Sequence, residues 1–405
     1  MESPDSSSRS SSPPPSALFE CTEGVKEYMN FDDMNLSDEL LRGIYAYGFE
    51  SPSPIQRKAI VPMVDGKSII AQAQAGTGKT GAFVIGSLMR IDPKIKAPQV
   101  IILSPTRELT QQTEAVARSI STHMGITVHS ATGGPPITED IKALQRGAQF
   151  IVGTPGRVYA LIRRRALLLD NIRVLILDEA DQMLENKFKE QIMCILEFKF
   201  PHNTQVGLFS ATMPIEVIDI AERLAGDDAI RILINPEKLT LEGVKQYYVE
   251  LDQEDWKFEA LYDLYQNLNI NQLIIFVNKR QKAEWLAYKM KEKGFTLECI
   301  HGDMDVSERR TRMNEFRSGQ VRVLISTDLL ARGIDVQQVS MVINYDFPID
   351  RENYLHRIFR AGRFLKKGVA INFVSGEEFK MMKEAQKYFN LNIGELPNNL
   401  AALTV

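Results

Sequence analysis

Cysteine, long apolar runs and an excess of one charge sign are all scarce in this chain of 405 residues. The three cysteines, Cys21, Cys194 and Cys299, lie far apart and form no CxxC pair, so the sequence indicates neither a zinc site nor a disulfide framework. Unpaired thiols suit a reducing compartment. No run approaches about 18 apolar residues, and the N-terminus has no apolar signal segment. We therefore expect a cytoplasmic protein without a membrane span.

The charges nearly balance, because 48 Lys and Arg face 52 Asp and Glu and leave a net charge of −4. This balance does not indicate a nucleic-acid binder, but a local basic groove is enough to contact phosphates. Hydrophobic residues make up 44% and charged residues 25%, which is typical of globular proteins and excludes a collagenous, coiled-coil or wholly disordered chain. At about 100–200 residues per domain, the length predicts two or three domains.

Residues 1–16 contain eight Ser and four Pro and cannot bury enough apolar surface to offset their ordering, so we predict a disordered tail over residues 1–27. Beyond it, short β-branched runs alternate with helical stretches such as Arg107–Ser119 and Pro136–Arg146, which predicts parallel sheets covered by helices on both faces. The polar, proline-containing residues 235–243 predict a linker between domains at 28–234 and 244–405. The predicted strands are Ser68–Ala71, Val100–Leu103, Phe150–Val152, Val174–Leu177, Gln205–Phe209, Lys245–Glu250, Gln272–Phe276, Thr296–Cys299, Val321–Ser326, Val339–Asn344 and Val369–Phe373.

A glycine-rich segment stands between the first of these strands and a helical stretch, and reads Ala73-Gln74-Ala75-Gly76-Thr77-Gly78-Lys79-Thr80. Glycines let backbone N–H groups surround a polyphosphate, and the helix N-terminus adds partial positive charge. We expect Lys79 to reach the β- and γ-phosphates and Thr80 to bind Mg²⁺. The usual pattern opens with Gly where this chain has Ala73, and the alternative is a structural turn. The intact Gly-Lys-Thr favours the phosphate site, here called the phosphate cradle.

Acidic residues follow the predicted strand Val174–Leu177, in the order Asp178-Glu179-Ala180-Asp181. One carboxylate can hold Mg²⁺ through water, and a second can orient the attacking water in phosphoryl transfer. An acidic turn alone is usually solvated surface. Paired with the phosphate cradle, this turn predicts the second half of a nucleotide site.

With these residues the chain resembles the DEAD-box RNA helicases, whose name spells residues 178–181, and the resemblance extends from Phe31 to the C-terminus. It implies two tandem RecA-like domains, ATP and Mg²⁺ as ligands, and Ala as the normal first residue of the cradle. Any one motif is weak, but the set occurs in the family order. The matching motifs are Gly48-Phe49 to Pro52, Ile55 and Gln56; the phosphate cradle; Pro105–Leu109; Gly133-Gly134; Thr154–Arg157; Asp178–Asp181; Ser210–Thr212; Ile275–Asn278; Ser326–Asp328 with Ala331–Asp335; and His356–Ile358 with Arg360, Gly362 and Arg363.

The resemblance implies how each motif meets the nucleotide. A side-chain amide can donate and accept at once, so Gln56 suits the adenine edge. Phe31 matches an upstream aromatic that stacks on the base, with an ordinary core Phe as the alternative. Two arginines of the second domain would approach the γ-phosphate, so hydrolysis requires domain closure. The implied catalytic residues are Lys79, Glu179, Arg360 and Arg363; residues 73–80, Asp178, Gly333 and Asp335 complete the nucleotide site; and Asp181, Ser210, Thr212 and His356 couple it to RNA.

The resemblance also implies an RNA groove between the two domains. Glycine backbones, Thr hydroxyls and Arg side chains suit phosphate and 2′-OH contacts, so we expect binding without sequence specificity. The residues implied are Pro105, Thr106, Arg107, Gly134, Thr154 and Arg157 on the first domain, and Arg280, Gly302 and Thr327 on the second.

Three places depart from the family pattern: Pro135-Pro136 after the glycine doublet, Leu365-Lys366, and Phe359, which stands where the arginine motif normally has Gly. A Gly permits close backbone approach or positive φ, so a Phe could misplace Arg360 and impair hydrolysis. The alternative, which we favour, is a tolerated ring that points outward.

Several segments resemble the branch of the family that acts in translation initiation more than the exon-junction branch, notably Phe31–Leu36, Arg42–Phe49, Leu239–Gly243 and Phe316–Gly319. This implies an ATP-dependent helicase that unwinds messenger RNA. The partners implied are single-stranded or structured RNA and a scaffold factor of the cap-binding complex, with no DNA and a monomeric chain. The alternatives are an ATP-gated RNA clamp and a weakly active regulatory relative.

Overall fold

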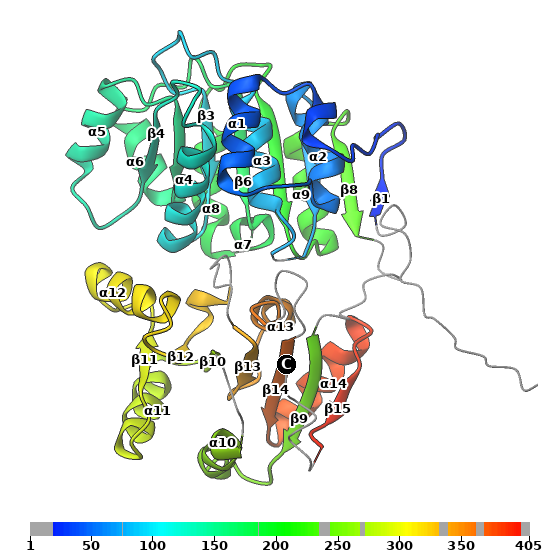
Figure 1. The fold of residues 1–405 in the computed structure, drawn as a ribbon, viewed down its shortest axis with the longest axis vertical. Helices are drawn as coiled ribbons and strands as arrows, with labels where there is room; N and C mark the ends of the chain where they lie inside the picture. Colours follow the sequence, from blue (N-terminus) through cyan, green and yellow to red (C-terminus); the bar gives the residue numbers. More distant parts are fainter. Residues whose placement is uncertain are drawn as a thin grey trace, which may run out of the picture.

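Two α/β domains follow one another along the chain and lie one above the other (Figure 1). The structure, a computed structural model, describes residues 19–74, 76–184, 186–234, 244–267, 272–331, 339–361 and 368–397. Each domain is built on its own sheet with helices packed against it, which confirms the predicted fold class. The predicted linker at 235–243 lies outside the described residues.

The first sheet has the strand order β1-β8-β2-β7-β6-β3-β5-β4 and is parallel except for the pair β1 and β8. Its four central strands, β2, β7, β6 and β3, are buried along almost their whole length, as a sheet covered on both faces requires. The strands are β1 Phe19–Cys21, β2 Ile69–Gln72, β3 Val100–Leu103, β4 Val128–Ala131, β5 Phe150–Gly153, β6 Val174–Asp178, β7 Gln205–Ser210 and β8 Ile230–Ile234.

Helices cover both faces of this sheet, and the strand residues divide between the faces in strict alternation. Val100 and Ile102 join the core under α1 to α4, whereas Ile101 and Leu103 join the core under α5 to α9. The helices are α1 Asp38–Tyr47, α2 Pro54–Val64, α3 Lys79–Leu88, α4 Arg107–Ile120, α5 Ile137–Gln145, α6 Pro155–Arg163, α7 Ala180–Leu184, α8 Asn186–Leu196 and α9 Ile215–Ala225, with a 3-10 turn, η2, at Phe31–Met34.

The second sheet has the order β11-β12-β10-β13-β14-β9-β15, and all its pairs are parallel. Its strands are β9 Val244–Glu250, β10 Leu273–Phe276, β11 Leu297–Ile300, β12 Val323–Ser326, β13 Met341–Asn344, β14 Gly368–Val374 and β15 Ile393–Glu395. Its helices are α10 Trp256–Asn267, α11 Arg280–Glu292, α12 Val306–Arg317, α13 Arg351–Ile358 and α14 Glu377–Tyr388, with a 3-10 turn, η4, at Asp328–Leu330. The first domain's α7 and the second domain's α12 and α13 lie along the seam between the domains (Figure 1).

The predicted disordered tail of residues 1–27 extends too far. Phe19–Cys21 forms β1, which pairs with β8 in the register Phe19 to Ile234. The Ser/Pro-rich composition stops at residue 16, and Phe19 beyond it supplies an apolar side chain that the first core buries. Strands β4, β8 and β15 are further elements that the sequence analysis did not predict.

Helices α1 and α4 make backbone contact at a single glycine. A Cβ built on Gly43 would lie 1.8 Å from the carbonyl oxygen of Ile120, the last residue of α4. A glycine inside a helix is less favourable than alanine by about 1 kcal/mol, but here no side chain fits. Close packing of α1 on α4 therefore depends on this residue. Of the helices in the described ranges, none is long and apolar enough to cross a membrane.

Candidate nucleotide and nucleic-acid site

The predicted motifs of the first domain, apart from Phe31 and the segment from Gly48 to Gln56, follow the carboxyl ends of its parallel strands, which form one edge of the sheet. The phosphate cradle follows β2, Ser210–Thr212 follows β7, and the acidic motif follows β6. The next two strands, β3 and β5, lead into Thr106 and Thr154. The strand order thus places the nucleotide motifs beside the RNA motifs, in the crevice where open α/β sheets bind ligands.

The phosphate cradle turns from β2 into α3 through Gly76 and Gly78, which have φ values of 79° and 98° and adopt the left-handed conformation that glycine favours. The Lys79 ammonium is almost fully buried and donates to the carbonyl of Ala73 at 2.8 Å. Burial lowers the pKa of Lys79, against the opposing carboxylates of Glu179 and Asp178. The cradle therefore places the Lys79 ammonium at the N-terminus of α3, and Thr80 is the second residue of that helix.

Two buried carboxylates lie at the end of β6. Asp178 and Glu179 are each 3% exposed, and Glu179 has a positive φ of 52°, which is uncommon for a residue with a side chain. Burial and the neighbouring Glu179 raise the pKa of Asp178 to about 8. Asp178 Oδ2 and Glu179 Oε2 are buried and accept no hydrogen bond from the described residues. Oxygen ligands left open in this way fit a hard cation such as Mg²⁺.

Gln56 is buried against the cradle, and its amide is used at both ends. Its Oε1 accepts from the backbone N–H of Ser53 at 2.9 Å, and its Nε2 donates to the carbonyl of Gly78 at 3.1 Å. The side chain therefore caps α2 and fixes the cradle at the same time. Phe31 is only 1% exposed and packs on Phe49 and Tyr45 in the core. Phe31 is therefore placed as an ordinary core residue, which was the alternative, and its ring exposes no face to a base.

The four predicted coupling residues meet in one buried cluster that crosses the seam. Asp181 accepts hydrogen bonds from Ser210 Oγ at 2.7 Å and Thr212 Oγ1 at 2.6 Å. His356, on α13 of the second domain, places Nε2 2.9 Å from Asp181 Oδ2 and 3.4 Å from Thr212 Oγ1. Asp181 and His356 are both fully buried. The cluster joins the acidic motif of the first domain directly to the helix that leads into Arg360.

Arg360 follows α13 and is 2% exposed, with Nε donating to the His356 carbonyl at 3.1 Å. Burial is the main cause that lowers the pKa of Lys79, and the charge of Arg360 adds to it in the same direction. Phe359 contradicts the expected outward ring: it is 6% exposed and packs among Phe347, Leu355 and other residues of the second domain's core. Its φ of −68° is open to any residue, so glycine is not required there.

A cleft of about 620 Å³ lies between the two domains at the predicted RNA groove. Thr106 and Thr154 are the N-caps of α4 and α6, so two helix N-termini end at this cleft. Helix N-termini and Thr hydroxyls suit phosphate oxygens. Six of the nine predicted RNA residues line the cleft: Pro105, Thr106, Arg107, Thr154, Arg157 and Gly302.

The other three predicted RNA residues are placed differently. Gly134 lies beside the cleft, because a Cβ there would be 3.4 Å from Val306 of the second domain and 3.5 Å from Arg107. Arg280 is exposed and forms an ion pair with Asp303, the residue after Gly302. Thr327 is half-buried at the end of β12, where its carbonyl accepts from Ser326 Oγ at 2.9 Å. Ala75, Gly333, Asp335 and Arg363 lie outside the described residues.

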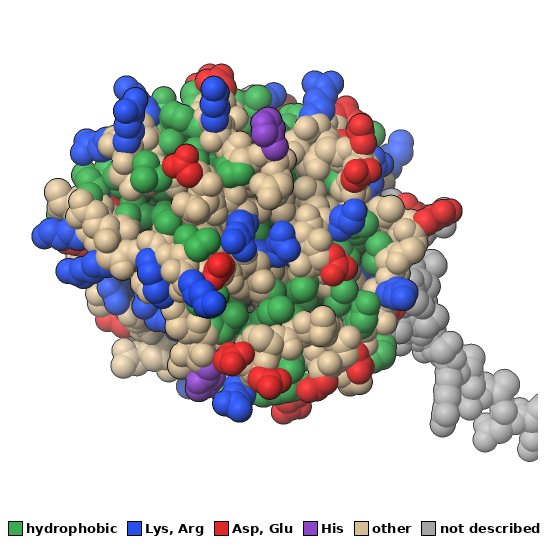
Figure 2. Space-filling model, turned by 90° about the horizontal axis from the view of Figure 1, so that it is seen from above, with side chains coloured by type: hydrophobic (Ala, Val, Ile, Leu, Met, Phe, Trp, Pro, Cys, Tyr) green, Lys and Arg blue, Asp and Glu red, His purple; other side chains and the backbone are tan. Residues whose placement is uncertain are grey.

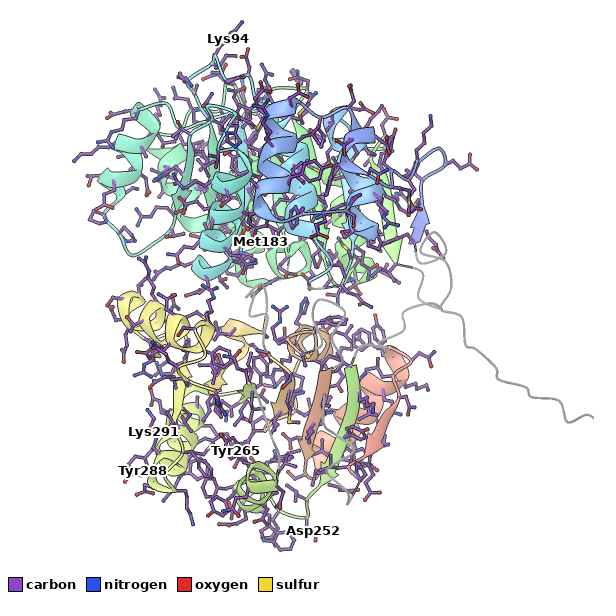
Figure 3. All side chains as sticks on the ribbon, in the orientation of Figure 1. Lys94, Met183, Asp252, Tyr265, Tyr288 and Lys291 are labelled. Carbon is purple, nitrogen blue, oxygen red and sulfur yellow. The ribbon has the colours of Figure 1, made fainter. Side chains whose placement is uncertain are left out.

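An ion pair spans the seam next to the cleft. Arg309 Nε, on α12, lies 3.0 Å from Glu108 Oε1, on α4, and both side chains are largely buried. In Figure 3, Met183 of α7 lies on the side of the first domain that faces this seam, and Lys94 lies at the opposite end. That opposite end mixes Lys and Arg with Asp and Glu (Figure 2). No broad basic surface covers the described residues of that face, in keeping with the net charge of −4.

Comparison with known proteins agrees with this geometry. Residues 53–220 match the DEAD/DEAH box helicase family, and residues 256–365 match the helicase conserved C-terminal domain. The "ATP-dependent RNA helicase eIF4A" of Chaetomium globosum is 53% identical over 92% of this chain and 94% of its own length. The chain belongs to the DEAD/DEAH box helicase family.

Solved structures of Dbp5 of S. cerevisiae resemble this fold. Dbp5 "bound to RNA and ADP BeF3" has a TM-score of 0.86 at 38% identity, covering 92% of this chain and 97% of its own. A variant of Dbp5 bound to nup159, a variant of gle1, ip6 and ADP gives 0.62 at 37% identity, covering 90% and 96%. The whole chain is therefore more similar to the RNA-bound structure of Dbp5 than to the second structure.

Three positioning residues of this helicase were missed by the sequence analysis. Arg357 is fully buried and donates to Asp328, Asn278 and the Asp346 carbonyl at 2.5, 2.7 and 2.8 Å, which fixes α13 on the second sheet. Its place between His356 and Ile358 in the arginine motif was the available signal. Glu108 lies inside the motif Pro105–Leu109, but its partner Arg309 belongs to no motif named above, so only the structure shows that they pair.

Proposed function

We propose that this protein binds RNA without sequence specificity and unwinds messenger RNA structure in translation initiation, using ATP. The observation that carries the proposal is the buried cluster of Asp181, Ser210, Thr212 and His356, which joins the nucleotide motifs to the second domain across the seam between the domains. The identity of about half its residues with helicases named eIF4A supports the assignment to initiation.

In this proposal the cradle and the acidic motif bind ATP together. Lys79 would hold the β- and γ-phosphates, Thr80 and Asp178 would hold Mg²⁺, and Glu179 would orient the attacking water. When bound, Mg²⁺ would supply positive charge beside the phosphate oxygens. Arg360, with Arg363, approaches the γ-phosphate from the second domain and stabilises the charge of the transition state. Gln56 reads adenine with the hydrogen-bonding capacity that Ser53 and Gly78 leave over.

RNA binds in the cleft through its backbone. The N-termini of α4 and α6 with Thr106 and Thr154 contact phosphates, and Arg107 and Arg157 add positive charge. Both ligands touch both domains, so each favours the closed arrangement and thereby the other ligand. Strand separation follows if only one strand fits the closed cleft.

Phe359 gives no support to the weakly active alternative, because its ring is buried in the second domain's core and its φ requires no glycine. We further propose a monomeric, cytoplasmic protein. Its partner would be a scaffold initiation factor of the cap-binding complex, and DNA would not be a substrate.

The test is an RNA-stimulated ATPase and duplex-unwinding assay on the purified chain, with binding of single-stranded RNA measured with and without a non-hydrolysable ATP analogue. We expect ATPase stimulation, unwinding, and tighter RNA binding with the analogue. The matched variant is Asp181→Asn, which leaves the cradle intact but removes the charge that Ser210, Thr212 and His356 surround, and should lose most of the stimulation. No stimulation in the wild-type chain would refute the proposal, and stimulation without unwinding would favour the clamp.

A further inference from the structure

Arg157, one of the arginines that line the RNA cleft, does not lie free in it. Its Nη1 donates to Asp140 Oδ2 at 2.9 Å, and its Nη2 donates to the carbonyl of Pro135 at 2.5 Å. The guanidinium is thus fixed by two separate segments, namely α5 and the turn after the glycine doublet. Because its fork is planar and five donors are available, Arg157 keeps further N–H groups for a ligand.

Asp140 is the side chain that fixes the Arg157 guanidinium through this ion pair. It is 4% exposed, and its second oxygen, Oδ1, lies 2.8 Å from Nε2 of His129 on β4. With one oxygen facing His129 and the other facing Arg157, the carboxylate is fixed in orientation. A buried carboxylate is unfavourable unless it is paired and hydrogen-bonded, so its presence here requires a specific partner. That partner is a residue of the RNA cleft.

We propose that Asp140 is a positioning residue for RNA binding, which sets the Arg157 guanidinium in the conformation that meets the RNA backbone. The proposal rests on the proposed function, because it assigns the cleft to RNA. A long arginine side chain loses conformational freedom when it binds a ligand, and a side chain that is already ordered loses less. Asp140 therefore raises RNA affinity although it carries the same charge sign as RNA.

Because Asp140 and RNA are both negatively charged, the direction in which RNA affinity changes on neutralising Asp140 tests the proposal. If Asp140 acted only through its charge, its neutralisation beside a phosphate-binding cleft would tighten RNA binding. If it positions Arg157, Asp140→Asn weakens binding instead. We expect the dissociation constant for single-stranded RNA to rise about tenfold, which corresponds to about 1.4 kcal/mol. The salt dependence should also fall, by about 0.7 in the slope of log K against log salt, because one phosphate contact is lost from a single strand.

The experiment uses the full chain with a non-hydrolysable ATP analogue and compares wild type, Asp140→Asn, Asp140→Glu, Arg157→Ala and the double variant Asp140→Asn with Arg157→Ala. The matched control is Asp170→Asn, which removes one exposed carboxylate of the first domain. We expect Arg157→Ala and the double variant to bind RNA equally weakly, because Asp140 has no effect once its arginine is gone. Asp140→Glu, which keeps the carboxylate, should recover part of the affinity.

A thermal melt and the RNA concentration for half-maximal ATPase separate positioning from a merely structural role. Positioning moves the half-saturating RNA concentration together with the dissociation constant, whereas loss of fold lowers the melting temperature and kcat as well. The proposal is overturned if Asp140→Asn binds RNA as wild type does or more tightly, if the double variant is additive, or if the affinity loss follows only the melting temperature. Absence of RNA binding by the wild-type chain would instead refute the proposed function.

Discussion

Phe359 gives the sharpest prediction, because sequence and structure place it differently. Its ring is 6% exposed and packs with Phe347, Leu355 and Met382 in the core of the second domain. Phe359→Ala removes that ring and leaves a cavity, and such substitutions cost about 3–5 kcal/mol. A domain is stable by only about 5–15 kcal/mol. At about 2–4 °C per kcal/mol for a domain of this size, the melting temperature of the second domain should fall by about 6–20 °C.

The assay can follow the second domain alone, because the only two tryptophans of the chain, Trp256 and Trp285, lie in α10 and α11. Urea unfolding read by tryptophan fluorescence therefore reports on this domain. The matched control is Ile349→Ala, which truncates a hydrophobic side chain that is 72% exposed and should cost less than about 0.5 kcal/mol. A loss below about 1 kcal/mol in Phe359→Ala, or a kcat above wild type once the folded fraction is corrected for, would show that the ring lies near Arg360 instead.

Three other predictions concern the nucleotide. Lys79→Ala should abolish ATP hydrolysis in an ATPase assay while circular dichroism and melting temperature stay near wild type; near-normal turnover would exclude the cradle as the site. ATP should be hydrolysed in preference to GTP by about tenfold or more, since mismatched buried polar groups cost about 1–3 kcal/mol, and equal rates would contradict the role of Gln56. Burial raises the pKa of Asp178 to about 8, so below that pH Mg²⁺ must displace a proton. The apparent Mg²⁺ affinity measured with ADP should therefore increase by up to tenfold per pH unit as the pH rises toward 8, and a profile as flat as that of Asp178→Asn would contradict this.

Most of the strands that sequence could predict are buried on both faces, although β9 is half-exposed and β11 ends its sheet. The apolar runs of β3, β6 and β10 are continuous because helices cover both sides of the sheet there. The four missed strands are β1, β4 and β15, which end their sheets, and β8, which borders β1. Edge strands need fewer apolar residues, so β4, with the sequence Val-His-Ser-Ala, has a polar middle and no such run. The partner strand β5, and not its own composition, makes β4 a strand, whereas β8 reads Ile-Arg-Ile-Leu-Ile and is a strand pattern that the sequence analysis overlooked.

Within the site, the sequence predicted which residues gather but not which atoms they use. Asp181, Ser210, Thr212 and His356 meet as the resemblance implied, although 175 positions separate Asp181 from His356. By contrast, Asp140 stands in a predicted helix but belongs to no motif, and only the structure shows that it pairs with Arg157 of α6. Phe31 and Phe359 show the same limit, because the sequence of a motif does not show whether an aromatic ring contacts a ligand or packs in the core.

The contact at Gly43 fixes the position of α1 relative to the C-terminal end of α4 in the first domain. Helix α4 has 14 residues and is therefore about 20 Å long; Arg107 of the RNA cleft begins it, and Ile120 at its far end touches Gly43. Helix α1 continues from Gly43 to Tyr47, next to Phe49, which borders Gln56 at Gly81. The methyl group of an alanine at residue 43 would shift α4 along its axis or tilt it away from α1. Packing at Gly43 thereby affects the separation between Gln56 and Arg107, which lines the cleft between the domains.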